Sequence, residues 1–399
     1  MRMLLLNGHG INMKVEKAKL HIKDGRYEDD IEPEEYRFSP KRINVNNIVI
    51  YGKSGEISIE AIRWLIKHNV QITILDWNGK LITTMLPPES VQVKTKFAQY
   101  HSYNDYKLRV ELSRKFIEAK INRTKSVLEW LKLRYKEINY DFSKEEEKLE
   151  NTKTIQEIMM IEARVAKIYW EELIKILPEK YEFQTREYMG RPMGAGDMIN
   201  CMLNYGYSIL EAECLRAINS AGLDAHIGFL HEITTGKNSL AYDLQEPFRF
   251  LIDLVVISSI EKGIMKNSDF IRTENYNLRL RPSGAKKLIS EISSQFNKKV
   301  RYKERDFTWD YLLMVQTREL AHYMLGLIRK IDFSEPFFEL NRVDTENVRK
   351  QILDMPYCKW KKMGFSKGAL SYMKGNAKSS KPFTLSKDVQ ERLERLSSS

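Results

Sequence analysis

The sequence has few cysteines and no long apolar run. Its three cysteines, Cys201, Cys214 and Cys358, lack CxxC spacing, which argues against both a disulfide framework and a cysteine-based zinc site. No uncharged stretch of about 18 residues is present to span a bilayer. MRMLLL is followed at once by the polar NGHGIN, so no signal peptide is predicted. These absences predict a soluble cytoplasmic protein without a membrane partner.

Composition favours a nucleic acid as the partner. The 399 residues are 42% hydrophobic, which is enough for about two or three packed domains. They include 65 Lys and Arg against 54 Asp and Glu, with a net charge of +11. A basic surface attracts polyanions, and because the signals of a membrane protein are missing, nucleic acid is the favoured polyanion.

Residues 1–90 are predicted to form a β-rich domain. Short apolar runs such as INVNNIVIY and VQITIL are separated by hairpin signals at Asp24-Gly25 and Asn78-Gly79. One helix over 58–68 interrupts the strands, with Ser58 as its N-cap. Its buried face is expected to consist of Ile59, Ile62, Leu65 and Ile66. Consecutive prolines at 87 and 88 mark the end of this domain.

Residues 91–345 change to a helical period and are predicted to form an all-α catalytic domain. The segments KLRVELSRKFIEAKINRTKSVLEWLKLRY and TIQEIMMIEARVAKIYWEELIKIL have the spacing of amphipathic helices. Between them, residues 139–153 are polar and charged, which favours a solvated loop.

Residues 346–399 are predicted to form a small helix-turn-helix domain that binds DNA. Residues 342–399 hold 13 Lys and Arg against 6 Asp and Glu. One helix is expected to stop at Pro356; a short second helix ends at a turn at Gly364, and a third begins with Ser366 as its N-cap. A small core is expected from Tyr357, Trp360, Phe365, Leu370 and Tyr372, which argues against a solvated tail. The expected DNA contacts are Lys359, Lys361, Lys362, Lys367, Ser371 and Lys374. The whole chain is thus of the α+β class.

Four polar residues in apolar segments are candidates for a metal site. Asp243 and Glu246 are three residues apart, so on a helix their carboxylates project from neighbouring positions. His231 precedes them, and by itself this pattern also fits a surface acidic pair with a core histidine. Glu162 lies in IMMIEARVAKIYW, a helix expected to be buried on several sides, where an unpaired carboxylate is costly. One imidazole with carboxylates predicts Mg²⁺ or Mn²⁺, with the nitrogen favouring Mn²⁺.

These segments resemble the core of the CRISPR-associated integrase family. Three pieces occur in the family's order: EARVAKIYW, then NYGYSILEAECLRAINSAGLDAHIGFLHE, then DLQE. GEISIEAIRWLIKHNVQITILDWNGKL is similar to the family's N-terminal domain, which mediates dimerisation. The resemblance implies that Glu162, His231 and Glu246 ligate the metal. It also implies that Asp243 orients His231 or binds a second ion, and that Arg249 holds phosphate.

A basic module beyond this core departs from adaptation integrases and resembles casposases, the transposon integrases of the same superfamily. The resemblance implies that a 3′-OH on donor DNA attacks a target phosphodiester, and that water in its place gives nuclease activity. The implied partners are double-stranded transposon ends with terminal inverted repeats, target DNA, and a second copy of the chain, with further assembly on DNA.

Two alternatives remain open at this point. The first is a CRISPR adaptation integrase that inserts spacers into a repeat array. The second is a non-enzymatic DNA-binding protein that works through the helix-turn-helix alone. The intact set of candidate ligands argues against the second, and the additional C-terminal module argues against the first.

Overall fold

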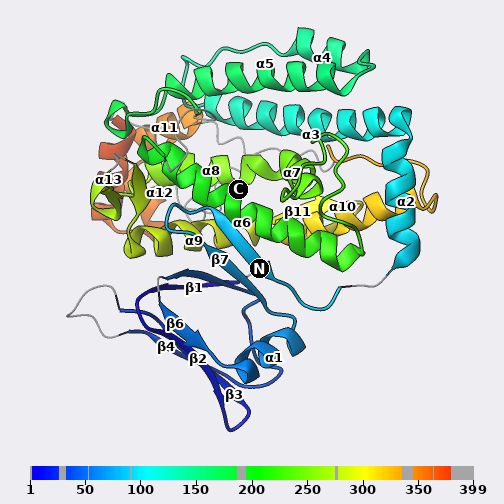
Figure 1. The fold of residues 1–399 in the computed structure, drawn as a ribbon. Helices are drawn as coiled ribbons and strands as arrows, with labels where there is room; N and C mark the ends of the chain where they lie inside the picture. Colours follow the sequence, from blue (N-terminus) through cyan, green and yellow to red (C-terminus); the bar gives the residue numbers. More distant parts are fainter. Residues whose placement is uncertain are drawn as a thin grey trace. The chain divides into compact units, whose positions relative to one another are not determined.

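Figure 1 shows the computed structural model, which describes residues 2–26, 33–52, 54–89, 92–186, 195–274, 277–334, 345–362 and 364–378. The chain divides into two compact units. The first comprises Met1–Lys125 and Tyr140–Phe338, and the second comprises Ser126–Asn139 and Glu339–Ser399. No helix among the described residues is both long and apolar enough to cross a membrane.

Two small sheets and one helix form the N-terminal part of the first unit. One sheet has the strand order β1-β5-β7-β8, and the other has the order β4-β3-β2-β6. Alternate residues such as Leu6, Ile48 and Ile72 point into an apolar core shared with Met13 and Leu65. The strands are β1 (Met3–Gly8), β2 (Ile11–Glu16), β3 (Lys19–Lys23), β4 (Glu35–Phe38), β5 (Asn47–Gly52), β6 (Gly55–Ile57), β7 (Gln71–Leu75) and β8 (Leu81–Met85).

The turn at Asn78-Gly79 is confirmed, whereas Asp24-Gly25 is no tight turn but begins the longer connection between the antiparallel strands β3 and β4. β7 and β8 pair antiparallel around Gly79, whose φ is +83°. Asp24 instead follows β3 directly and accepts a hydrogen bond from the backbone N of Asn7 at 2.7 Å. The tight hairpin of this region joins β2 to β3 through Lys17 and Ala18, both with positive φ. Neither residue type indicates such a turn.

The helix α1 (Ile59–Lys67) forms where it is predicted, although it turns a different face to the core. Ser58 Oγ accepts from the backbone N of Ala61 at 3.1 Å, which confirms the N-cap. Ala61, Trp64 and Leu65 are buried, whereas Ile59 is 69% exposed. Ile59 was expected inside because it is apolar; its place in the first turn leaves it beyond the edge of the core.

Helices build most of the remainder of the first unit, as predicted. Residues 139–153 are not a loop, because α4 forms there and buries Glu145 and Leu149. Two antiparallel ribbons, β9 with β10 and β11 with β12, were not predicted, so the region is mainly rather than wholly α-helical. The elements are α2 (Val93–Asn104), α3 (Tyr106–Lys132), α4 (Ser143–Glu150), α5 (Ile155–Ile174), η1 (Glu179–Tyr181), α6 (Met198–Ala221), α7 (Ser239–Gln245), η2 (Glu246–Phe248), α8 (Arg249–Glu261), η3 (Asn267–Asp269), β9 (Phe270–Arg272), β10 (Leu278–Leu280), α9 (Pro282–Phe296), β11 (Lys299–Tyr302), β12 (Arg305–Thr308) and α10 (Trp309–Met324).

A buried polar network joins the first sheet to α6. On the sheet face opposite the apolar core, Asn47 Nδ2 donates to Glu213 Oε1 at 2.8 Å. Thr73 Oγ1 donates to Asn47 Oδ1 at 3.0 Å, and Gln71 Nε2 donates to the carbonyl of Ala212 at 3.2 Å. Because these groups are buried, any change of register would leave several of them without partners. The network therefore fixes the position of the sheet against α6.

The described C-terminal helices of the second unit are α11 (Thr345–Asp354), α12 (Tyr357–Lys362) and α13 (Lys367–Lys378). Gly364 makes the turn with a φ of +85°, and Ser366 Oγ accepts from the backbone N of Ala369, so both predicted signals are confirmed. Trp360 is fully buried in a small core with Ile352, Leu370 and Ala377. The expectation that Tyr357 and Tyr372 belong to this core is wrong, since they are 39% and 71% exposed.

We predict that Gly79→Ala destabilises the protein more than Gly236→Ala does. Both glycines have positive φ, near +80°. A Cβ at Gly79 would overlap the ring of Tyr205 on α6, whereas a Cβ at Gly236 meets nothing within 4 Å. We expect a loss in the free energy of unfolding of about 2–5 kcal/mol for Gly79→Ala and about 1–2 kcal/mol for Gly236→Ala. Urea denaturation of both variants checks this, and equal losses would contradict the packing of the hairpin on α6.

Candidate metal and DNA site

The carboxylate of Asp243 holds the loop that carries His231. Asp243 on α7 is fully buried, and its two oxygens accept the backbone N–H groups of Phe229, Leu230 and His231. Its Oδ1 also lies 2.7 Å from His231 Nδ1. Both oxygens are therefore occupied. Of the two expected roles of Asp243, the arrangement favours orienting His231 over binding a second ion.

Close backbone packing makes this anchor possible. A Cβ on Gly228 would stand 2.9 Å from Asp243 Oδ2 and 2.7 Å from the carbonyl carbon of Ser239, so only glycine fits there. With Nδ1 engaged by Asp243, the other ring nitrogen of His231 faces the cavity and makes no hydrogen bond to any described residue. Burial lowers the pKa of His231, but the hydrogen bond and charge of Asp243 raise it above its usual value.

Glu246 is placed by a break in the helix at Pro247. The chain leaves α7 at Gln245, makes the 3-10 turn η2, and enters α8 at Arg249, a local distortion of the kind that proline causes in a helix. Glu246 Oε1 accepts from Arg249 Nε at 3.0 Å. Burial by itself would raise the pKa of Glu246, but the charges of Arg249 and Lys120 lower it to about 2. Glu246 is therefore an ionised, buried carboxylate.

Glu162 reaches the same cavity from α5. Its side chain is 26% exposed, and its neighbours Met159 and Met160 are also exposed. The prediction that this helix is buried on several sides is therefore wrong, because one face of α5 forms the wall of the cavity. The opposite face packs inward through Ile158, Ile161 and Val165.

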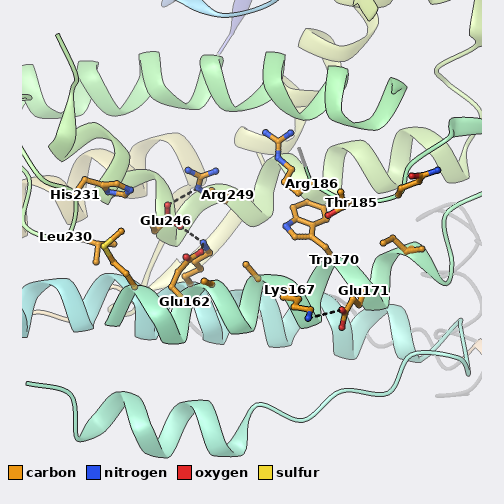
Figure 2. Close-up of a pocket in the computed structure, with 16 residues that line it drawn as sticks. Glu162, Lys167, Trp170, Glu171, Thr185, Arg186, Leu230, His231, Glu246 and Arg249 are labelled. Carbon is orange, nitrogen blue, oxygen red and sulfur yellow. Dashed lines mark hydrogen bonds and ion pairs between the residues drawn. The ribbon is translucent and has the colours of Figure 1, made fainter. Parts of the chain in front are cut away.

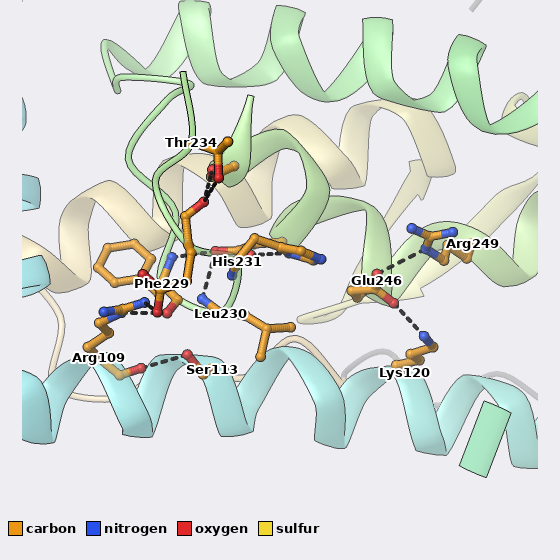
Figure 3. Close-up of polar contacts among 12 residues, drawn as sticks. Arg109, Ser113, Lys120, Phe229, Leu230, His231, Thr234, Glu246 and Arg249 are labelled. Atoms are coloured by element: carbon orange, nitrogen blue, oxygen red, sulfur yellow. Dashed lines mark hydrogen bonds and ion pairs between the residues drawn. The ribbon is translucent and has the colours of Figure 1, made fainter. Parts of the chain in front are cut away.

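Two cations on α3, which the sequence alone did not indicate, organise the site (Figure 3). Lys120 Nζ pairs with Glu162 Oε1 and lies 2.7 Å from Glu246 Oε2. Arg109 donates from Nε to the carbonyl of Phe229 at 2.8 Å and pairs with Glu232 at 2.9 Å. Lys120 follows the buried Phe116 by four residues and shares its face of α3, but this spacing does not distinguish it from the other lysines of the helix.

Lys120, Glu162, His231, Glu246 and Arg249 line a cavity of about 600 Å³ (Figure 2). Glu162 and Trp170 project into it from α5, opposite His231, Glu246 and Arg249. Arg186 also lines it and donates to Asn200 and Asn204 on α6. Its lining residues are Lys120, Met159, Glu162, Ala163, Ala166, Lys167, Trp170, Glu171, Ile174, Gln184, Thr185, Arg186, Leu230, His231, Glu246 and Arg249. Cationic and anionic groups thus share one cavity.

Asp253 fastens three helices behind this cavity. Its carboxylate accepts from Tyr207 Oη at 2.6 Å and from Tyr169 Oη at 3.1 Å, which ties α8 to α6 and α5. The ring of Tyr207 in turn lies 4.8 Å from the guanidinium carbon of Arg249. Burial raises the pKa of Asp253 to about 6, against the two hydroxyls, which lower it.

The candidate ligands fit a divalent cation in chemistry and direction. Two carboxylates and one imidazole nitrogen face a single cavity, and the buried Glu246 Oε2 lies 2.7 Å from Lys120 Nζ. Within the described ranges, however, no three His, Cys, Asp or Glu side chains are gathered closely enough to hold a metal ion. The ammonium of Lys120 stands between the two carboxylates. A divalent ion would therefore have to take the place of this ammonium.

The predicted DNA-binding residues fall into two groups. Arg249 lines the cavity in the first unit. The others lie on or beside α12 and α13 in the second unit; they are Lys359, Lys361, Lys362, Lys367 and Ser371, which are exposed, and Lys374, which is half-buried. Each side chain of the second group is accessible to a partner at least in part.

Known structures share this architecture. A casposase bound to integration product is 58% identical, with a TM-score of 0.85 over 90% of this chain and 100% of that chain. A Cas1 protein from Thermotoga maritima, at 18% identity, shares the fold, with a TM-score of 0.68 over 82% of this chain and 97% of that chain.

The fold, the cavity and these likenesses define the class, which is that of the casposase-like DNA integrases. Residues 4–294 match the family described as CRISPR associated protein Cas1, and the chain belongs to this family. The CRISPR-associated endonuclease Cas1 1 of Archaeoglobus fulgidus is 29% identical over 81% of this chain and 96% of the relative. The protein of the same name in Francisella tularensis subsp. novicida is 30% identical over 82% of this chain and 96% of that relative.

We predict that Asp253→Asn changes how stability depends on pH. The carboxyl has a pKa of about 6 in the folded protein against 3.8 as a free group, so folding favours its protonated form. The contribution of the protonated carboxyl to the free energy of unfolding is fully present below pH 3.8 and is lost as pH rises through about 6. An amide keeps partners for both tyrosines and does not titrate. The free energy of unfolding of the parent protein, relative to Asp253→Asn, should therefore fall over this interval.

Thermal denaturation across that pH range measures the difference. The exposed Asp306, paired with Arg301 at 3.4 Å, provides a matched control as Asp306→Asn. If the stability of the parent and that of Asp253→Asn change in parallel with pH over the whole range, Asp253 does not take up a proton on folding.

Proposed function

We propose that this DNA integrase joins the 3′-OH ends of transposon DNA to target DNA by transesterification. The observation that carries the proposal is the convergence of Glu162, His231 and Glu246 on one cavity that is also lined by Arg186 and Arg249. Carboxylates with an imidazole suit a divalent cation, and guanidinium groups suit phosphate. The likeness to a casposase bound to integration product supports the same reaction.

Glu162, Glu246 and the cavity-facing nitrogen of His231 would hold Mn²⁺ or Mg²⁺. When bound, such an ion supplies activation of the attacking 3′-OH and neutralises charge that develops on the phosphate. Arg249 and Arg186 would orient phosphate oxygens at the cavity. Asp243 keeps His231 in place from behind, as groups that hydrogen-bond a metal-ligating histidine do.

No side chain of the site needs to serve as a nucleophile. Cys201 and Cys214 are buried on α6, and burial raises the pKa of both thiols, so neither thiolate is available. The attacking group is then the DNA 3′-OH, or water in the nuclease reaction. A CRISPR adaptation integrase would use the same chemistry and is supported by the curated Cas1 relatives.

We further propose that the chain acts as a homodimer and that its C-terminal helices read the terminal inverted repeats. Three short helices around Trp360 present an exposed, lysine-bearing surface on α12 and α13. Exposed lysines on a compact helical unit suit contacts with the DNA backbone, whereas the polar and aromatic side chains of α13 suit the bases.

We predict that His231→Ala abolishes strand joining in a folded protein, because His231 is the one imidazole among the described residues that line the cavity. Asp243→Asn should reduce joining by about 10- to 100-fold, since it leaves His231 present but less firmly held. The assay uses a donor duplex with a free 3′-OH, a plasmid target and Mn²⁺.

The matched control is His226→Ala, which removes a surface histidine paired with Asp224 at 3.0 Å. It should join DNA at the parent rate. Full activity in folded His231→Ala would refute the assignment of the metal site.

We predict that changing Lys361, Lys362 and Lys374 together to Ala weakens binding to all duplexes alike. Each lysine that neutralises a phosphate contributes about 0.9 to the slope of log K against log salt, so the slope should fall by about two to three units. Fluorescence anisotropy over a salt series measures it.

Two controls separate position from charge. Lys144, Lys148 and Lys153 changed to Ala remove the same charge from exposed positions on or beside α4 and should alter the slope less. Glu162→Gln should leave the slope intact and stop joining. An unchanged slope in the first triple variant would show that the C-terminal lysines do not contact DNA.

A further inference from the structure

Lys120 occupies the position between the two candidate acidic ligands. Its ammonium pairs with Glu162 on α5. It also lies 2.7 Å from Glu246 Oε2, a contact that Figure 3 shows. Its side chain is 14% exposed and lines the cavity. A monovalent cation of the chain itself therefore sits where a divalent cation would bind both carboxylates.

The charges of this cluster are already balanced. Glu162 and Glu246 carry two negative charges, and Lys120 and Arg249 carry two positive charges. A divalent ion added beside both cations would bring the net charge of these four groups and the ion to about +2, and like charges this close repel one another. Binding of the ion is favourable only if one cation moves away or if anionic phosphate enters.

We propose that Lys120 is an internal counter-cation that competes with the divalent ion for Glu162 and Glu246 and so couples metal loading to DNA binding. The inference rests on the metal site of the proposed function. DNA relieves the competition because its phosphate receives the displaced ammonium. By linkage, metal and DNA then strengthen each other's binding by the same factor.

The surroundings explain why Lys120, and not Arg249, is the cation that moves. Arg249 is held by the Tyr207 ring and by Oε1 of Glu246. Lys120 has a flexible stem with a point charge, and the cavity of about 600 Å³ gives its end room to turn. Its contacts with the protein can thus be exchanged for contacts with phosphate without moving a helix.

The test is the affinity for Mn²⁺ in the absence of DNA, measured from the electron paramagnetic resonance of the free ion. Lys120→Met should bind Mn²⁺ at least roughly tenfold more tightly than the parent, since a competing charge is gone. Lys120→Arg keeps the charge and should bind as weakly as the parent. Lys115→Met is the matched control, because Lys115 lies on the same helix and pairs with Glu118 outside the cavity.

A second measurement adds a duplex with a free 3′-OH. The parent should gain Mn²⁺ affinity on binding the duplex, and Lys120→Met should gain less. Because Lys120→Met leaves Glu246 with one partner fewer, its folding is checked by circular dichroism. If Lys120→Met unfolds, Lys120→Gln is used in its place. The glutamine amide still donates to the carboxylates but carries no charge, so this variant should show the same increase in Mn²⁺ affinity.

The outcomes distinguish this inference from the proposed function. If His231→Ala and Glu246→Gln bind Mn²⁺ as the parent does, the ion lies elsewhere and the proposed metal site fails. If they lose the ion but neither neutral Lys120 variant binds it more tightly than the parent, the metal site stands and the competition by Lys120 is refuted.

Discussion

A buried charge must be satisfied, and the way in which Asp243 is satisfied determines the form of the site. Its two oxygens collect three backbone N–H groups and one imidazole nitrogen. These hydrogen bonds hold the loop against α7, and the close approach at Gly228 leaves no room for a side chain there. Arg109 holds the same loop from α3 through the carbonyl of Phe229. His231, which faces the cavity, is thus held in place by Asp243 on α7 and by Arg109 on α3.

The helix α3 supplies both the support and the counter-charge of the site. Arg109 and Lys120 are separated by 11 residues, which is close to three helical turns, so they lie on one face. One side chain holds the histidine loop and the other holds two carboxylates from α5 and η2. Through Lys120, α3 therefore links two candidate ligands, Glu162 and Glu246, that are more than 80 residues apart in sequence. Asp253 adds a second link between α5, α6 and α8.

Periodicity and caps predicted where most elements lie, and resemblance predicted which polar residues meet. The Ser58 and Ser366 caps and the break at Pro247 follow from local chemistry, which a sequence reports directly. The outward position of Ile59 and the strand turn at Lys17-Ala18 do not, because tertiary packing overrides local preference there. Lys120 was missed for another reason. A lysine among many on a basic helix gives no sign that it faces two carboxylates, and only the arrangement of three helices in space reveals that pairing.

The 3-10 turn at Pro247 sets the helical phase of the site. Pro247 offers no N–H to the carbonyl of Asp243, so the backbone winds by three residues per turn instead of 3.6. Over three residues this adds about 60° of rotation. Glu246 and Arg249 consequently stand almost directly above one another, with 3.0 Å between Arg249 Nε and Glu246 Oε1. In an uninterrupted α-helix the same two side chains would lie about 60° apart around the axis. The alignment of the carboxylate with the guanidinium is in this sense encoded by a residue that has no polar side chain.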